Sequence, residues 1–156
     1  MEKTYQEVAD YNDKIWNDLE QESKTGVLSR HRMILLKLKQ AGFNSKSTLL
    51  EIGCGIGTLS SYLAKTNIDG KVDAVDISPA TIEFAKNKYK GLKNLEFFVS
   101  DMTDFSIDKK YDFILFPDVL EHIPVEAHEN IFNTIKNFCH DNSIVAINLP
   151  TARSLR

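Results

Sequence analysis

The sequence predicts an α/β fold in which five parallel strands alternate with helices. Five short runs rich in apolar and β-branched residues predict the strands: TLLEI (48–52), VDAVDI (72–77), LEFFVS (95–100), YDFILF (111–116) and SIVAINL (143–149). Several of these runs are nearly continuous in apolar residues, as expected for strands buried on both faces. Helical patterns separate most of them, and a length of 156 residues favours a single domain.

Start and stop signals mark the expected helices. The amphipathic run LSRHRMILLKLKQ precedes the first strand. Ser78 followed by Pro79 predicts a helix start, because serine caps free N–H groups and proline fits the first helical position. A further helix is expected from about Val125 to Cys139, whereas the connection 101–110 has room for no more than a turn of helix.

Composition and charge argue against several classes of protein. The net charge is −3, so the chain has no broad basic surface of the kind that holds nucleic acid. No apolar run approaches the roughly 20 residues that cross a bilayer. The polar start MEKTYQEVADYNDK does not have the pattern of a signal peptide. Cys54 and Cys139 belong to no ligand or redox pair, which favours free thiols in the cytoplasm.

Two segments are expected within this single domain. Residues 1–42 form a helical N-terminal segment that carries Tyr5, Tyr11 and Trp16. This segment either covers the binding site as a lid or packs its aromatic side chains against the sheet. Residues 43–156 form the core that contains all five predicted strands.

A glycine turn follows the first predicted strand, where Gly53, Gly55 and Gly57 occur within five residues. A dinucleotide-binding fingerprint reads GxGxxG, but here the third glycine comes one residue early and Thr58 holds its place. Glu51 also precedes the turn, and a carboxylate beside a pyrophosphate would be repelled. The turn therefore favours a ligand that carries a positive charge over a diphosphate.

Acidic residues follow the other strands at the edge where ligands bind in such sheets. Asp76 lies at the end of the second strand, where a carboxylate can accept both hydroxyls of a ribose. Asp101 and Met102 follow the third strand, and this pair suits an adenine. The carboxylate can accept a hydrogen bond from the adenine amine, and the thioether can contact the ring. The fourth strand is followed by PDVLEH (117–122), with two further acids and a histidine.

Four segments together, LLEIGCGIGTLS, VDAVDIS, SDMTDF and YDFILFPDVLEHIP, resemble the class I S-adenosylmethionine-dependent methyltransferases. The resemblance covers roughly residues 30 to 150 and is strongest to small-molecule methyltransferases with a Glu-His pair after the fourth strand. It implies a Rossmann-like, doubly wound sheet. It also implies a cytoplasmic enzyme that moves the methyl group of S-adenosylmethionine to a small-molecule acceptor and releases S-adenosylhomocysteine.

The family sheet usually has seven strands, and its last two form an antiparallel hairpin that is missing here. The chain stops at Arg156, so we expect either part of a longer protein or a minimal variant. Without the hairpin, the apolar fifth strand would form an exposed edge. Self-association through this edge, or marginal stability of the isolated chain, is therefore expected.

The resemblance implies that the glycine turn lies beside the methionyl part of the cofactor. The matching residues are Glu51, Gly53, Cys54 and Gly55. It also implies that Pro117 and the turn after it close over the methionine and face the acceptor.

The resemblance assigns the nucleoside to the next two strand ends. Asp76 would hold the ribose hydroxyls with Ile77 beside the adenine, and Asp101 would accept from the adenine amine with Met102 against the ring. Some relatives bind the cofactor carboxylate with a basic residue before the first strand, and Arg30 is the favoured candidate here, with its neighbours His31 and Arg32 as competitors.

His122 is the candidate base, needed only where the acceptor must lose a proton, and packing of the next helix is the alternative role. Asp118, Glu121 and His122 resemble the ExxEH metal site of some O-methyltransferases, but the first residue is shorter, so no metal is expected. Two other functions compete with methyl transfer. One is a catalytically silent module that binds the cofactor or a partner, and the other is an NAD-dependent oxidoreductase.

Overall fold

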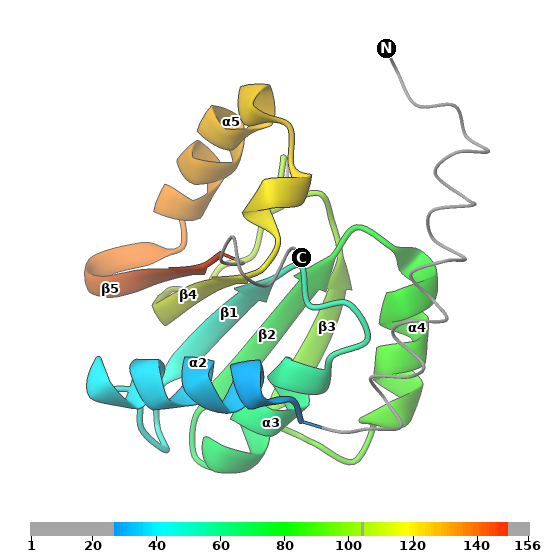
Figure 1. Ribbon diagram of the computed structural model, residues 1–156, viewed down its shortest axis with the longest axis vertical. Coiled ribbons are helices and arrows are strands. Elements are labelled where there is room, and N and C mark those ends of the chain that lie inside the picture. Colours follow the sequence, from blue (N-terminus) through cyan, green and yellow to red (C-terminus); the bar gives the residue numbers. More distant parts are fainter. Residues whose placement is uncertain (1–26, 104, 150–156) are drawn as a thin grey trace.

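The computed structural model describes residues 27–103 and 105–149 (Figure 1). Its elements in chain order are α2 (Ser29–Gln40), β1 (Thr48–Ile52), α3 (Thr58–Thr66), β2 (Lys71–Asp76), α4 (Pro79–Lys88), β3 (Leu95–Val99), β4 (Tyr111–Pro117), the short 3₁₀ helix η1 (Leu120–His122), α5 (Val125–Lys136) and β5 (Cys139–Asn148). The aromatic residues Tyr5, Tyr11 and Trp16 of the expected lid lie outside the described residues.

The five strands form one parallel sheet in the order β3-β2-β1-β4-β5. The chain runs outward from β1 to β3, returns to β4 beside β1, and continues to β5 on the other side. This reversal confirms the predicted Rossmann-like, doubly wound topology, and it places a crevice for ligands where β1 and β4 end. Among the described residues, no antiparallel hairpin follows β5.

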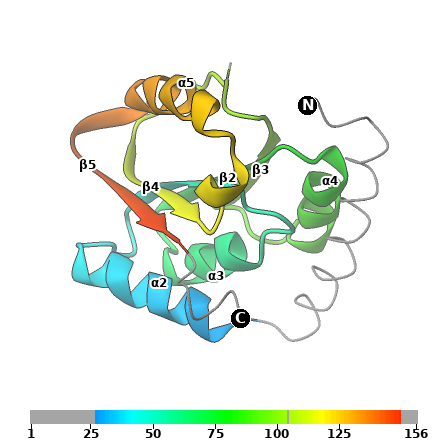
Figure 2. The ribbon, with the colours of Figure 1, turned by 45° about the horizontal axis from the view of Figure 1, so that its top comes forward.

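Helices cover both faces of the sheet (Figures 1 and 2). On one face, α2 and α3 pack against Leu49 and Phe113 in a single apolar cluster, while α4 packs on Ala74. On the other face, α5 packs Ile131 and Ile135 against inward side chains of β1, β2 and β4. The central strands β1, β2 and β4 are therefore buried on both sides, which explains why they are mostly apolar.

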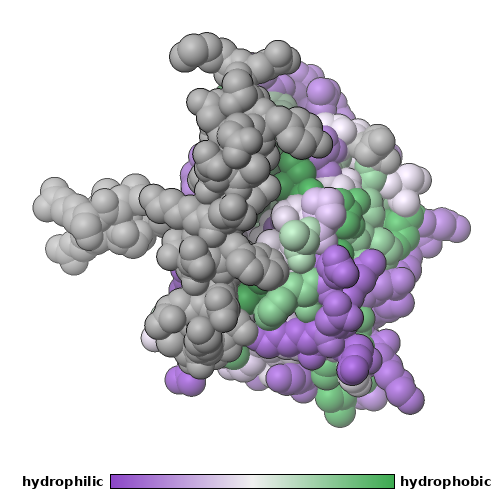
Figure 3. Space-filling view, turned by 90° about the vertical axis from the view of Figure 1, so that its right-hand side faces the viewer, coloured by the Kyte–Doolittle hydropathy of each residue, from purple (hydrophilic) through white to green (hydrophobic). Residues whose placement is uncertain are grey.

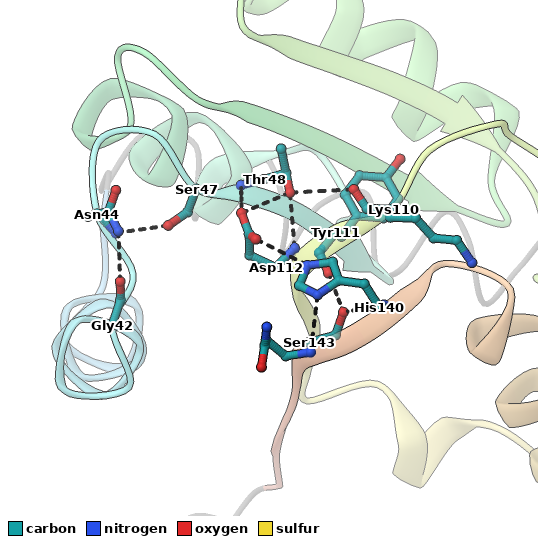
Figure 4. A network of polar contacts seen from close by, with 10 residues as sticks. Gly42, Asn44, Ser47, Thr48, Lys110, Tyr111, Asp112, His140 and Ser143 are labelled. Atoms are coloured by element: carbon teal, nitrogen blue, oxygen red, sulfur yellow. Dashed lines mark hydrogen bonds and ion pairs between the residues drawn. The ribbon is translucent and has the colours of Figure 1, made fainter.

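β5 begins four residues earlier than the predicted run at 143, and its pairing with β4 changes register between Tyr111 and Phe113. A polar network holds this irregular start (Figure 4). Asp112 accepts hydrogen bonds from the backbone and hydroxyl of Thr48 (2.7 and 3.0 Å), and its other oxygen lies 3.2 Å from His140 Nε2. Polar side chains hold this part of the strand, so an apolar pattern does not reveal it.

β5 is an edge strand, as predicted, and it exposes the apolar side chains of Ile144, Val145 and Ile147, with Leu149 exposed just after it. None of the helices that the structure describes is long and apolar enough to pass through a bilayer.

Figure 3 looks onto the α4 side of the molecule, where hydrophilic residues lie between smaller apolar areas. The predicted self-association depends on a different surface, which is the unpaired apolar edge of β5.

Gly57, the third glycine of the turn, is required by packing inside the protein. Its φ is +78°, and a Cβ built there would lie 2.6 Å from the ring of Phe97 on β3. Gly57 also stands immediately before α3, so the turn, the helix and β3 meet at this point. The position of this glycine therefore follows from the close approach of an aromatic side chain.

We expect Gly57→Ala to lower the free energy of unfolding by about 3 kcal/mol in urea denaturation. Left-handed strain contributes about 1–2 kcal/mol and overpacking against Phe97 about 1–3 kcal/mol. Gly42→Ala is a control with the strain alone, because φ is +103° but no atom lies within 4 Å of its Cβ. Gly91→Ala has neither problem. Equal losses at Gly57 and Gly42 would contradict the packing role.

Candidate functional site

The glycine turn is folded back against the end of β2. Gly53 and Cys54 both donate their backbone N–H to Val75 O, at 2.8 and 3.0 Å, and Gly55 donates to the carboxylate of Asp76 at 2.8 Å. Gly53 and Gly55 have positive φ angles of 77° and 52°. Glycine adopts this region without strain, so the turn brings bare backbone to the carboxyl edge of the sheet.

A cavity of about 250 Å³, here called cavity A, lies between the glycine turn, the start of α2 and the end of β4. Its lining includes Glu51, Gly53, Cys54, Gly55, Pro117, Arg30 and His31. Glu51 is buried and accepts a hydrogen bond of 2.5 Å from Ser60 on α3. This bond orients the carboxyl group, so cavity A combines the buried side chain of Glu51 with the guanidinium of Arg30.

A larger cavity of about 790 Å³, here called cavity B, lies over the ends of β2 and β3. Its lining includes Asp76, Ile77, Asp101, Met102 and Thr103 from the ends of β2 and β3. Most of the rest comes from Glu121 and His122 of η1, from the apolar residues that flank η1, and from α5. Ile77 is 70% exposed although it is apolar. Cavity B therefore combines carboxylates with a mainly apolar lining.

Asp76 already accepts several hydrogen bonds from its own surroundings. Oδ2 accepts from Gly55, and Oδ1 accepts from the Ser78 backbone (2.9 Å) and from the hydroxyl of Thr81 at a longer 3.3 Å. A carboxylate has about four acceptor positions. Asp76 thus keeps capacity on Oδ2 for a hydroxyl in cavity B, and a second hydroxyl would compete with Thr81.

Asp101 lies in a tight turn in which Oδ1 accepts from both the backbone and the hydroxyl of Thr103, at 2.9 and 2.7 Å. The backbone hydrogen bond from Thr103 is the main cause that lowers the pKa of Asp101. Its other oxygen has no partner among the described residues. Met102 is 2% exposed with a φ of +68°, so its side chain belongs to the core and forms the floor of cavity B.

His122 lies where the two cavities meet, because it and Gly53 line both of them. η1 carries this histidine, and the preceding Val119 packs so tightly on Gly53 that a Cβ on Gly53 would lie 2.4 Å from its Cγ2. The turn after β4 therefore rests directly on the glycine turn. The structure brings together the ends of β1, β2, β3 and β4, as the sequence predicts.

Arg30 and His31 lie at the start of α2 beside Asp118. Arg30 Nε is 4.0 Å from Asp118 Oδ2 and 3.4 Å from His31 Nε2. Burial, with Arg30 next to it, lowers the pKa of His31 to about 4, against the opposing effect of Asp118. The imidazole of His31 is therefore neutral at pH 7, and Arg30 carries the positive charge at cavity A. Arg32 is exposed and does not line either cavity.

The structure does not bring Asp118 together with Glu121 and His122. The carboxylate of Asp118 is directed at Asn148 (2.6 Å) and Arg30, whereas Glu121 and His122 lie 4.0 Å from each other. No group of three or more potential ligands that could hold a metal ion is found among residues 27–103 and 105–149. We therefore propose no metal site for these three residues.

Three contacting residues were not identified from the sequence: Ser60, Val119 and Asn148. Ser60 orients Glu51, Val119 packs on Gly53, and Asn148 binds Asp118. Each contact joins separate elements, and nothing in the local pattern marks it. Ser60 alone gives a hint, since a polar residue on the buried side of a predicted helix requires a partner.

Comparison with known proteins gives the same fold. The structure superposes on an S-adenosylmethionine-dependent methyltransferase from Clostridium acetobutylicum with a TM-score of 0.70, at 20% identity over 90% of this chain and 58% of that one. A methyltransferase from Aquifex aeolicus gives 0.67, at 25% identity over 82% and 70%. Coclaurine N-methyltransferase bound to N-methylheliamine and S-adenosylhomocysteine gives 0.64, at 24% identity over 74% and 34%.

The chain spans about a third of the length of the curated relatives it matches. It is 37% identical over 87 residues to malonyl-[acyl-carrier protein] O-methyltransferase 1 of Ilyobacter polytropus, covering 56% of this chain and 32% of the relative. It is 26% identical over 117 residues to (S)-coclaurine N-methyltransferase of Thalictrum flavum, covering 74% and 32%. The family model of the methyltransferase domain matches residues 49–142, which is more than half of the chain. The chain therefore belongs to the methyltransferase-domain family, as its resemblance to the class I S-adenosylmethionine-dependent enzymes predicts.

Proposed function

We propose that the chain binds S-adenosylmethionine across cavities A and B and transfers its methyl group to a small-molecule acceptor. The observation that carries the proposal is the junction of the two cavities. The glycine turn and the ends of the first four strands line a continuous set of surfaces that share Gly53 and His122. A ligand with a nucleoside at one end and an amino acid at the other suits this arrangement.

The nucleoside fits cavity B by its polar groups. Asp76 Oδ2 is available to a ribose hydroxyl, and the unpartnered oxygen of Asp101 is available to the adenine amine. Ile77 would lose its large exposure by packing on the base, which is favourable for an apolar side chain. Met102, the apolar residues that flank η1 and those of α5 would contact the ring from the other sides.

The amino-acid part fits cavity A by charge. Glu51 supplies a carboxylate for the ammonium group, and Arg30 supplies a guanidinium for the carboxylate. Pro117 and the turn after it enclose the same cavity. The backbone of Gly53 and Gly55 has no side chain that would occupy the space between them, which leaves the turn open to close approach.

When bound, S-adenosylmethionine supplies a methyl group on a sulfonium whose departure as a thioether requires no further activation. The residues around it then have three tasks, which are to align the acceptor, to exclude water and, for some acceptors, to take a proton. His122 is the proposed base, since it lies at the junction of the cavities and is exposed on its other side. Val119 and the rest of the turn exclude water above Gly53.

The acceptor is proposed only as a class. Relatives are named for O-methylation of a malonyl-acyl carrier protein and for N-methylation of an alkaloid, so both oxygen and nitrogen acceptors occur among them. The chain matches only about a third of their length, and the same fold supports many chemistries. Cytoplasmic location and self-association through the edge of β5 both stay predictions.

Two alternatives are separated by specific observations. An NAD-dependent oxidoreductase is disfavoured because Glu51 lies at cavity A, where a carboxylate would repel a pyrophosphate. A catalytically silent module would bind the cofactor equally well, so binding does not distinguish it. Turnover with a panel of hydroxyl, carboxylate and amine acceptors does.

Calorimetric titration tests the cofactor assignment. The wild-type chain should bind S-adenosylhomocysteine and bind NAD far more weakly. Asp76→Asn should weaken binding of S-adenosylhomocysteine about tenfold or more, because it removes a charged acceptor while keeping the shape of the side chain. Asp108→Asn, at an exposed position outside both cavities, is the matched control and should have no effect.

Tighter binding of NAD than of S-adenosylhomocysteine would overturn the proposed function. So would an Asp76→Asn variant that is folded and binds S-adenosylhomocysteine as well as the wild type.

A second prediction concerns His122. With an acceptor that must lose a proton, His122→Gln should lower kcat about 100-fold, in line with the usual contribution of a general base, while affinity for S-adenosylhomocysteine stays within about twofold. His140→Gln, at the opposite end of the sheet, controls for the loss of a histidine and should keep wild-type turnover. An unchanged kcat in His122→Gln would leave this residue a packing role only.

A further inference from the structure

Asn148, the last residue of β5, lines neither cavity A nor cavity B. It forms hydrogen bonds with Asp118, which does line cavity A. We propose that Asn148 is a positioning residue that fixes Asp118, and through it Arg30, for the amino-acid part of the ligand. The inference rests on the proposed function and deepens it, because it extends the binding site to the end of the edge strand. The family model matches residues 49–142 and therefore ends before this position.

Two hydrogen bonds join Asn148 to Asp118. The backbone N–H of Asp118 donates to Asn148 O at 3.0 Å, and the side-chain amide of Asn148 donates to Asp118 Oδ1 at 2.6 Å. The preceding residue, Pro117, is paired with Asn148 in the β4–β5 ladder. The side-chain bond is the only one of these that depends on asparagine at position 148.

Asp118 needs such support because its backbone is in the left-handed region. Its φ is +51°, which is uncommon for a residue with a side chain, although aspartate tolerates it better than most. Strained conformations of this kind persist only where the surroundings hold them. The turn that Asp118 opens carries Val119 onto Gly53 and His122 to the junction of the cavities. The bond from Asn148 therefore fixes the start of this turn beside cavity A, whereas the packing of Val119 on Gly53 holds the part of the turn that lines cavity B.

The same bond divides the two oxygens of Asp118 between two partners. Oδ1 is taken by the amide of Asn148, and Oδ2 faces Arg30 Nε at 4.0 Å. The side chain of Asp118 is 26% exposed, so its carboxylate is partly shielded from water, whereas the side chain of Arg30 is 52% exposed. A carboxylate with a fixed orientation limits the positions that Arg30 adopts at the mouth of cavity A. Without Asn148, Asp118 is free to rotate and to bind Arg30 with both oxygens, which would compete with a ligand carboxylate.

The test uses two ligands that differ only in the part that Asn148 is proposed to serve. S-adenosylhomocysteine has both the nucleoside and the amino acid, whereas 5′-methylthioadenosine has the same nucleoside thioether without the amino acid. Affinities are measured by calorimetry for the wild type, Asn148→Ala and Asn148→Asp, with melting temperatures alongside. Asn142→Ala is the matched control, since Asn142 lies on the same strand, is exposed and lines no cavity.

Asn148→Ala should weaken binding of S-adenosylhomocysteine about tenfold and leave binding of 5′-methylthioadenosine within about twofold. Asn148→Asp should weaken S-adenosylhomocysteine further at neutral pH, because it sets one carboxylate against another at the contact with Asp118. Asn142→Ala should match the wild type for both ligands.

Equal loss of both ligands in Asn148→Ala would assign Asn148 a purely structural role, and no loss of either would overturn the inference outright. Both outcomes leave the proposed function standing as long as the wild type binds S-adenosylhomocysteine. A wild-type chain that binds neither ligand would overturn the proposed function itself, so the two failures are distinguishable.

Discussion

The hydrogen bond from Gly55 to the carboxylate of Asp76 is the interaction on which the site depends. It ties the turn after β1 to the end of β2, two elements that are neighbours in the sheet but separated by a helix in the chain. The bond also orients Asp76, leaving part of its acceptor capacity toward cavity B. One carboxylate therefore shapes the glycine turn and offers a contact to a ribose, which couples the fold of the site to its chemistry.

The turn after β4 closes on this arrangement from the opposite side. Val119 packs directly on Gly53, and the preceding Asp118 adopts a left-handed conformation beside the end of β5. The site is thus held by contacts between the ends of successive strands. Because strands are rigid elements, such contacts place side chains more reproducibly than long loops do. This construction explains how a small sheet presents two adjoining cavities, one lined by groups of both charges and the other mainly by apolar residues.

Much of this could be predicted from the sequence, because the evidence lies in local patterns. Apolar runs predicted all five strands, Ser78 with Pro79 predicted the start of α4, and the acidic strand ends predicted the lining of cavity B. The start of β5 was wrong by four residues, since a polar network around Asp112 and not apolar burial holds it. α5 ends at Lys136, three residues before the predicted end at 139.

The sequence could not predict the contacts that join distant segments. Asn148 and Asp118 are 30 residues apart, and only the parallel pairing of β4 with β5 brings them together. The sequence showed that the third glycine departs from the dinucleotide fingerprint, but it could not show that the ring of Phe97 on β3 packs against this glycine. Each of these depends on which strands are neighbours, and a single sequence does not state that directly.

A crystal structure of the chain with S-adenosylhomocysteine tests the central claim most directly, namely that cavities A and B form one binding site. The account predicts the ribose against Asp76, the adenine between Ile77 and Asp101, and the amino-acid part in cavity A between Glu51 and Arg30. A ligand bound in the reverse direction, or held outside cavity B, would contradict it.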